Sequence, residues 1–185
     1  MAQVLEASRR LFAARGFTET SMRDIADELG IRAPSLYNHV QSKHHLLDMI
    51  ISEQLDGGDA MLRDTRAGTA PATELVDRLM RLHVRYRLER PEATQIISRE
   101  TMNLSPEQRT RLLDSRAAYL EHWQSIIEAG VAEGVFTVSR PEISAVVLAG
   151  LFDYIQVQVL SLEKGIPEGE LEDWYSAHAI GMLTG

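Results

Sequence analysis

Residues 20–46 constrain the fold of this chain more than any other segment, because two short helices joined by a sharp turn can be read there. Ser21 is a good N-cap for the first helix, and Asp24 lies three residues on, where its carboxylate closes a capping box. An apolar helical stripe follows at Ile25, Ala26 and Leu29. These residues predict a short, well-capped helix that begins just after Ser21.

The turn and the second helix follow at once. Gly30 lies where a sharp helix exit needs a residue that tolerates positive φ. Pro34 falls in the first turn of the next helix, where its missing N–H costs nothing. Leu36 and Val40, one turn apart, are expected to face inward together with Ile31. The segment is therefore the sequence form of a helix-turn-helix, in which the second helix lies in the major groove of DNA.

The outward face of the second helix carries side chains of the types that read DNA. Arginine and asparagine form two-pronged hydrogen bonds with base edges, while hydroxyl groups and Lys43 suit phosphate oxygens. The side chains expected on this face or at its flank are Arg32, Ala33, Ser35, Tyr37, Asn38 and His39. A solvated face on an ordinary helical hairpin is the alternative. Because the cap, the glycine, the proline and the polar cluster agree in register, the DNA-binding interpretation is favoured.

The same segment resembles a known family. The pattern I-A-x-x-L-G-I-x-x-P-S-L-Y-x-H-V-x-S-K-x-x-L-L-D is similar to the N-terminal domain of TetR-family transcriptional regulators, and Leu11, Phe12, Gly16 and Phe17 match the family's helix-one pattern L-F-x-x-x-G-[FY]. The resemblance covers residues 4–50, and the string Pro34 to Val40 looks especially like the tetracycline repressor branch. It implies an all-α protein with a three-helix helix-turn-helix head at residues 1–46. A larger helical ligand-binding and dimerisation body is expected at residues 47–185.

The resemblance also implies roles for individual residues. Phosphate contacts are expected from Ser21, Arg23, Tyr37 and Lys43, base-edge contacts from Arg32, Ser35 and Asn38, groove contacts from Ala33 and Pro34, and a backbone contact from His39. The function it implies is a ligand-responsive regulator of transcription. We expect a repressor that is released from a palindromic operator in double-stranded DNA when a small-molecule effector binds the body.

Composition narrows the remaining possibilities. The chain has 185 residues and no cysteine, which excludes disulfides and thiolate metal sites. No apolar run reaches the ~18 residues of a membrane span, and charged residues interrupt the N-terminus early, so we expect a cytoplasmic protein. The histidines show no chelating spacing, and no catalytic or nucleotide-binding motif is present. We therefore expect no metal, no cofactor and no enzymatic activity.

The charge is unevenly distributed along the chain. The net charge is −8, yet residues 1–48 carry six basic and six acidic side chains, while residues 49–185 carry 13 basic and 21 acidic ones. An acidic body is repelled by phosphate and is expected to point away from DNA. The chain opens at Met1-Ala2-Gln3, without the basic arm that relatives usually carry. We expect fewer bound phosphates and a shallower salt dependence, with a log–log slope that falls by roughly 0.9 for each phosphate left unbound.

The rest of the chain predicts only helices. The expected ranges are 2–15, a helix that begins near Ser42, then 72–89, 92–103, 105–133 and 168–183. Between the last two ranges, residues 139–142 are expected to open a further helix, and residues 165–167 to close it. The helix that begins near Ser42 is expected to break or loosen at Gly57-Gly58. Residues 144–162 are apolar nearly all the way round, so that helix is expected to be covered on two sides. With the last helix, it is predicted to form a four-helix bundle across the two-fold axis of a homodimer; the alternative is a central helix in a monomer.

A ligand cavity is expected in the body. Its candidate lining residues are Met80, His83, Tyr86, Arg87, Met102, Tyr119, Trp123, Ile127, Phe152 and Gln156. A mixture of apolar residues and a few polar tips is typical of a small-molecule pocket, and equally of a helical core. His83 and Arg87 are one helical turn apart, and either one suits a carboxylate or phenolate.

The sequence is also compatible with a second class of protein. The chain is alternatively a helical small-molecule binding protein or enzyme whose head does not bind DNA. Such a protein has no reason to place base-reading side chains from Arg32 to His39, and this face favours the regulator.

Overall fold

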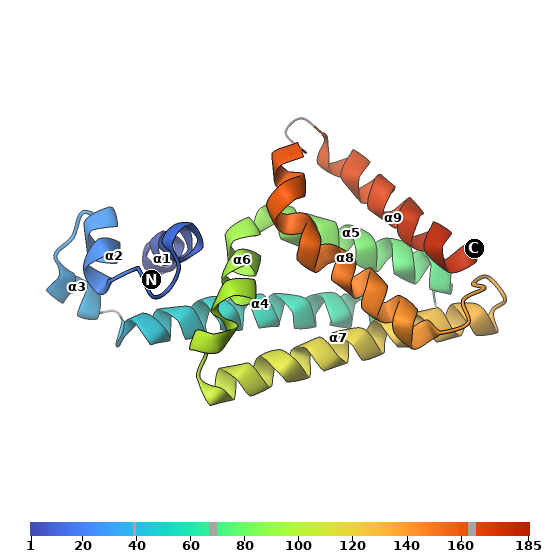
Figure 1. Ribbon diagram of the computed structural model, residues 1–185, viewed down its shortest axis with the longest axis horizontal. Coiled ribbons are helices and arrows are strands. Elements are labelled where there is room, and N and C mark those ends of the chain that lie inside the picture. The colour runs from blue at the N-terminus through green and yellow to red at the C-terminus, as the bar shows by residue number, and fades with distance from the viewer. Residues whose placement is uncertain (39, 67–69, 163–165) are drawn as a thin grey trace. The chain divides into compact units, whose positions relative to one another are not determined.

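The computed structural model describes residues 1–38, 40–66, 70–162 and 166–185, and within them the chain is helical (Figure 1). The side chains of residues 66, 94, 98 and 152–162 lie outside this description. The elements in chain order are α1 (Ala2–Arg15), α2 (Met22–Glu28), α3 (Ala33–Tyr37), α4 (Lys43–Arg66), α5 (Ala72–Glu89), α6 (Pro91–Glu100), the 3₁₀ turn η1 (Thr101–Asn103), α7 (Pro106–Ala132), α8 (Pro141–Leu162) and α9 (Glu168–Thr184). The predicted all-α fold is confirmed. None of the described helices has the length and apolar character to cross a membrane.

The chain forms two compact units. The first, here called the head unit, comprises Met1–Asp56 and Pro91–Leu113; the second, the body unit, comprises Gly57–Arg90 and Asp114–Gly185. Helices α4 and α7 therefore contribute to both units, and α6 belongs to the head unit. The predicted boundary at residue 46 divides DNA-binding residues from ligand-binding residues. It describes function rather than compact units, and it stays a prediction.

Local signals in the head unit act as the sequence predicted. Helix α1 ends at Gly16, which has a φ of 93°. The capping box of α2 is confirmed: the N–H of Asp24 donates to Oγ of Ser21 at 3.1 Å, and the N–H of Ser21 donates to Oδ2 of Asp24 at 2.7 Å. Gly30 has a φ of 66°, as the turn requires, and Pro34 lies in the first turn of α3.

The core of the head unit joins all of its helices. Its fully buried side chains include Phe12, Ile25, Leu36, Leu46, Leu47, Ile50, Ile51 and Ile96. The predicted burial of Leu36 and Val40 is confirmed, with 0% and 2% of their surface exposed. The predicted burial of Ile31 is wrong, since 38% of its surface is exposed. The reason is local, because α3 begins only at Ala33 and Ile31 lies in the turn, outside the apolar stripe of the helix.

The body unit is built on the packing of α5 against α9, which run side by side (Figure 1). Its core includes Val76, Leu79, Met80, Trp123, Ile127, Leu148, Ala179 and Leu183. Ion pairs fasten the edge of this contact: Nη2 of Arg85 lies 3.0 Å from Oε1 of Glu172, and Nη2 of Arg81 lies 2.7 Å from Oδ1 of Asp173. Only 6% of the surface of Glu172 is exposed, so this carboxylate is held between the two arginines rather than in water.

The expected loosening of α4 at its double glycine is wrong, because the helix runs on to Arg66. The two glycines have different surroundings. A Cβ added to Gly57 overlaps the ring of Tyr86, whereas a Cβ added to Gly58 meets nothing within 4 Å. Gly57 therefore leaves room for the Tyr86 ring of α5 against α4, and no neighbouring atom requires a glycine at position 58.

This difference predicts opposite effects of the same substitution. Gly58→Ala should stabilise the protein by about 0.5–1 kcal/mol, because alanine has the better helix propensity and has room for its methyl group. Gly57→Ala should destabilise it by about 1–3 kcal/mol, because the methyl group displaces the Tyr86 ring. Chemical denaturation of both variants measures the two changes. Two effects of the same sign would contradict this account of α4.

Candidate functional site

The predicted DNA-facing residues lie on one exposed side of α3 and its flanks. Arg32 is the N-cap residue of α3, and Leu36 is the side chain that anchors the helix in the core. The exposed residues around this anchor are Arg32, Pro34, Ser35, Tyr37 and Asn38, with Ala33 half-buried. Tyr37 is 54% exposed. His39 lies outside the described residues. The five-residue helix thus presents its base-reading types to solvent, as the sequence predicted.

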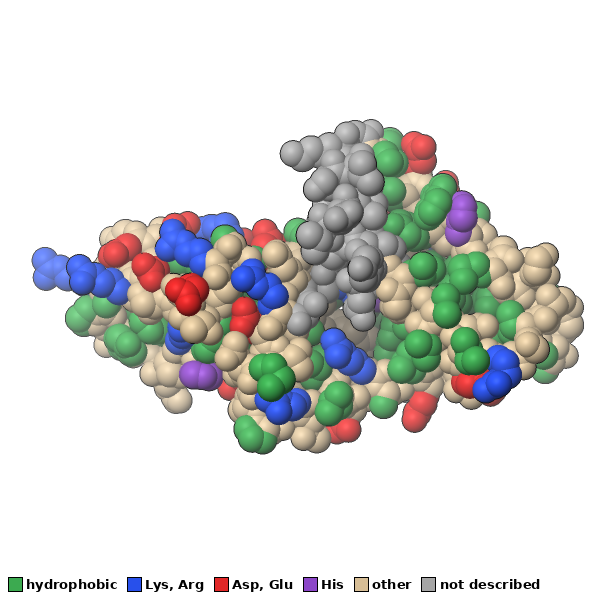
Figure 2. Space-filling model, in the orientation of Figure 1, with side chains coloured by type: hydrophobic (Ala, Val, Ile, Leu, Met, Phe, Trp, Pro, Cys, Tyr) green, Lys and Arg blue, Asp and Glu red, His purple; other side chains and the backbone are tan. Residues whose placement is uncertain are grey.

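Three of the six basic side chains of residues 1–48 are paired with carboxylates. The ion pairs are Arg9 with Glu6 and Glu53, Arg10 with Glu6 and Glu28, and Arg15 with Asp24. Figure 2 shows basic and acidic side chains intermingled over this unit. Arg23 and Arg32 differ, because each is exposed and neither has a carboxylate within 4.0 Å among the described residues. These two guanidinium groups are therefore the best placed to meet phosphate or base edges.

Two residues expected to contact phosphate have other bonds. The hydroxyl of Ser21 is used in the capping box, where its hydrogen bond to Asp24 lowers the pKa of that carboxyl group. Lys43 does not extend into solvent: its Nζ donates to the carbonyl oxygens of Phe17 and Thr20 at 2.6 and 2.7 Å. The expected phosphate contact of Lys43 therefore disagrees with the hydrogen bonds that its ammonium group makes.

A buried polar cluster lies in the body unit between α5 and α7. Nε of Arg87 lies 3.0 Å from Nε2 of His83, and the hydroxyl of Tyr119 lies 2.6 Å from Nδ1 of His83. Arginine is always protonated and donates here, so Nε2 accepts and the imidazole proton is on Nδ1. The imidazole then donates to the hydroxyl oxygen of Tyr119. Burial, and next the charge of Arg87, hold the pKa of His83 well below 6.5.

Trp123 adjoins this cluster. Its ring meets that of Tyr119 edge to face, with 6.4 Å between centroids, and none of its surface is exposed. Among the described residues, Nε1 of Trp123 has no hydrogen-bond partner. A buried N–H donor without an acceptor costs about 1–3 kcal/mol, and a bound molecule that supplies an acceptor recovers this free energy.

The other predicted ligand residues are distributed differently. Met80 and Ile127 are core residues of the body unit, and Tyr86 packs on Gly57. Met102 lies apart from the predicted ligand residues of the body unit: it belongs to η1 in the head unit, and 79% of its surface is exposed. The physical reason is that α6 ends at Glu100, so the chain turns before Met102 continues the helical face. Phe152 and Gln156 are part of α8, and their side chains lie outside the described residues.

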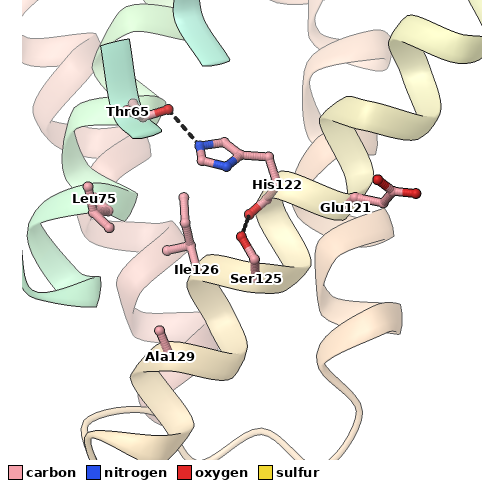
Figure 3. Close-up of a pocket in the computed structure, with 7 residues that line it drawn as sticks. All are labelled: Thr65, Leu75, Glu121, His122, Ser125, Ile126 and Ala129. Atoms are coloured by element: carbon pink, nitrogen blue, oxygen red, sulfur yellow. Dashed lines mark hydrogen bonds between the residues drawn. The ribbon is translucent and has the colours of Figure 1, made fainter. Parts of the chain in front are cut away.

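Sequence reasoning missed a hollow of about 370 Å³ in the body unit (Figure 3). Its walls come from the end of α4, the start of α5 and the middle of α7; they are formed by Thr65, Leu75, Glu121, His122, Ser125, Ile126 and Ala129. Thr65 gives its one hydroxyl proton to a backbone carbonyl of α4, so it accepts from Nε2–H of His122 at 2.7 Å. None of the predicted ligand residues whose side chains are described lines this hollow, which lies on another face of α7 from Tyr119 and Trp123. The i, i+4 pair His122 and Ile126 was the only sequence signal for it, and ordinary core packing has the same spacing.

Metal-binding chemistry receives no support from the described side chains. They contain no group of three or more histidine, cysteine, aspartate or glutamate residues that could hold an ion.

Comparison with known proteins identifies the class to which these features belong. Residues 4–50 match the tetR family of bacterial regulatory proteins, and residues 69–157 match the tetracyclin repressor-like C-terminal domain. The transcriptional repressor KstR2 of Mycobacterium tuberculosis is 31% identical over 98% of this chain and 92% of its own length. The structure of that ketosteroid transcriptional regulator superposes with a TM-score of 0.86 at 25% identity, over 100% of this chain and 94% of its own. AibR, solved with isovaleryl coenzyme A and operator DNA, shares the fold with a TM-score of 0.77 at 22% identity, over 98% and 96% of the two chains.

The chain belongs to the tetR family of bacterial regulatory proteins. It is a ligand-responsive DNA-binding repressor, with a helix-turn-helix head and a helical body. The predicted class of protein is therefore confirmed.

The buried imidazole makes the stability of the protein depend on pH. The pKa of His83 is about 6.5 in the unfolded chain and well below that value in the folded one. Well above pH 6.5 this residue is neutral in both states, and its contribution to stability is constant. As the pH falls through this value, the unfolded chain binds a proton that the folded chain excludes, so stability falls by up to about 1.4 kcal/mol per pH unit. His83→Gln should remove this loss, and denaturation curves of both proteins between pH 5 and 8 measure it. Parallel curves would contradict the buried neutral state.

Proposed function

We propose that the protein acts as a homodimer whose two heads bind the half-sites of a palindromic operator, and that an effector in the body unit releases it. The observation that carries this proposal is the exposed side of α3, where Arg32 and Asn38 flank the buried anchor Leu36. The protein acts in the cytoplasm, where bacterial DNA lies, and its function requires no enzymatic step.

The dimer is supported by apolar side chains that α8 and α9 expose. The exposed fractions are 50% for Ile143, 56% for Val146, 42% for Val147, 54% for Trp174 and 49% for Met182. Figure 2 shows apolar side chains gathered over these two helices. A large apolar patch on a monomer marks an interaction surface, and a second copy seated on both helices buries it. Two-fold symmetry then presents two recognition helices to half-sites about 34–36 Å apart.

Roles at the operator follow from charge and exposure. Arg32, Ser35 and Asn38 read or approach base edges, while Ala33 and Pro34 contact the groove. Arg23 and Tyr37 bind phosphates, and the family resemblance adds a backbone contact from His39. The side chains of Ser21 and Lys43 hold the helix-turn-helix itself. With few unpaired cations in the head, the salt dependence of binding is shallow.

The effector is an apolar molecule that ends in a hydrogen-bond acceptor. The cluster at His83 contains two donor groups, the guanidinium of Arg87 and the indole N–H of Trp123, which has no hydrogen-bond partner among the described residues. Apolar core residues surround it. The relative KstR2 is a ketosteroid transcriptional regulator, and a ketosteroid is an apolar molecule that ends in a carbonyl acceptor. Ketosteroids are therefore the first effectors to examine.

Selection from a random duplex pool tests the DNA-binding part. The purified protein is incubated with the pool at low salt, and the retained duplexes are sequenced. An enriched near-palindrome with two half-sites supports the dimeric regulator and provides the operator probe for the experiments below. Absence of enrichment would favour the alternative, a helical binding protein whose head does not bind DNA.

Arg32→Ala should relax sequence preference at one position of each half-site. Removal of a two-pronged hydrogen bond to a base costs about 1–3 kcal/mol. Arg23→Ala is the matched control: it should weaken operator and unrelated duplexes alike and reduce the log–log salt slope by about 0.9 per phosphate. Fluorescence anisotropy titrations over a salt series measure both quantities. Unchanged binding after both substitutions would show that α3 is not the recognition helix.

Arg87→Met should weaken the response to an effector. In a panel that begins with ketosteroids, the concentration that releases the operator probe should rise by about tenfold or more, because a charged hydrogen bond of roughly 1.5–3 kcal/mol is removed. Ser125→Ala, in the separate hollow of the same unit, is the control and should leave release unchanged. The reverse pattern would assign the effector to the hollow of Figure 3.

A further inference from the structure

Lys43, the first residue of α4, is bonded to the segment between α1 and α2. Its Nζ lies 2.6 Å from the carbonyl oxygen of Phe17, 2.7 Å from that of Thr20 and 3.3 Å from that of Thr18. The same nitrogen is 4.3 Å from the centroid of the Phe17 ring. An ammonium group has three N–H donors and no acceptor, so these three carbonyls use all of its donors.

The position of these carbonyls explains the attraction. The last carbonyls of a helix and of the turn after it lack helical partners, and the C-terminal end of a helix carries a partial negative charge. A cation at this end donates hydrogen bonds to the open carbonyls and also neutralises the partial negative charge. If Lys43 turned outward to a phosphate, it would leave three carbonyls without their charge-assisted hydrogen bonds. In place of these three hydrogen bonds, Lys43 would gain one partner, a solvated phosphate of the operator.

We propose that Lys43 is a positioning residue: it fastens the segment between α1 and α2 to α4 and so sets the direction of the helix-turn-helix, rather than neutralising an operator phosphate. The inference rests on the proposed DNA-binding function and deepens it. Thr20 is followed at once by Ser21, the N-cap of α2, and α2 packs directly on α3. A displacement of the fastened segment therefore moves the recognition helix.

The two roles of a lysine predict different changes in DNA binding. Removal of a phosphate-binding cation weakens all duplexes and lowers the log–log salt slope by about 0.9. A misdirected recognition helix no longer reaches the base edges, while its sequence-independent attraction to phosphate persists. The ratio of operator affinity to unrelated-duplex affinity then falls, and the salt slope stays the same.

Lys43→Arg and Lys43→Met separate these roles in the full-length protein. Arginine keeps the charge, but its flat, wider guanidinium does not fit three converging carbonyls; methionine keeps the stem and removes the charge. Both variants should show a preference for the selected operator over an unrelated duplex that is about tenfold weaker, the scale of one mismatched base pair. Salt slopes should match the wild type. A smaller fraction of folded protein reduces both affinities in proportion and leaves the preference intact, so titrations are made below the melting temperature of each variant.

Arg23→Met is the matched control, an exposed cation of the same motif that should lower the slope without changing the preference. The positioning role of Lys43 would be overturned if Lys43→Arg bound like the wild type and Lys43→Met lowered the slope like the control. Hydrogen exchange of the DNA-free protein adds an independent test. The amide of Thr20, bonded to the carbonyl of Phe17 at 3.3 Å, should exchange faster in both Lys43 variants. Unchanged exchange would also overturn the proposal, whereas a wild-type protein without operator preference would reject the DNA-binding function alone.

Discussion

Side chains from two later helices satisfy the polar groups left open at the end of α1, and the geometry of the head depends on them. Lys43 at the start of α4 holds the carbonyls of the segment that follows Gly16. From α6, Nη1 of Arg99 donates to the carbonyl of Ala13 at 3.1 Å, and the buried carboxylate of Glu100 accepts from the N–H of Phe17 at 3.0 Å. A helix end buried without partners is costly, so these bonds fix where α1 stops and where α2 begins. The helix-turn-helix is therefore held by residues outside its own motif.

The local features of the head could be predicted from the sequence, whereas its contacts between distant residues could not. The cap of α2 at Ser21, the positive φ of Gly30 and the position of Pro34 depend on residues at most a few positions apart, and all were predicted. The hydrogen bonds of Lys43 with Phe17 and Thr20 span more than twenty positions, and a lysine beside a recognition helix otherwise suggests phosphate. Met102 failed for a related reason: the helical pattern continues past Glu100, but the chain turns into η1. Periodicity alone does not show where a helix stops.

The polar cluster at His83 was predictable only in part. His83 and Arg87 lie one turn apart, and their meeting on α5 follows from helix geometry. Their contact with Tyr119 depends on how α7 packs on α5, which no local pattern specifies. The burial that holds His83 neutral also leaves Nε1 of Trp123 without an acceptor among the described residues. A core built only for stability fills such positions with apolar side chains. This polar cluster is the basis of the effector site proposed above.

An effector in the body unit weakens DNA binding only if a change there reaches the head unit, and the two effects must be reciprocal. The chain passes between the units at Asp56–Gly57 in α4, at Arg90–Pro91 between α5 and α6, and at Leu113–Asp114 in α7. The passage at Arg90–Pro91 is close along the chain to the polar cluster at His83, and the passage at Asp56–Gly57 is in contact with Tyr86, the neighbour of Arg87. Arg87 is one turn from the end of α5, and its neighbour Tyr86 fills the space beside Gly57. The Tyr86 ring is the contact between α5 and α4 at Gly57. A displacement of α5 would act through this ring on the helix whose first residue holds the recognition motif in place.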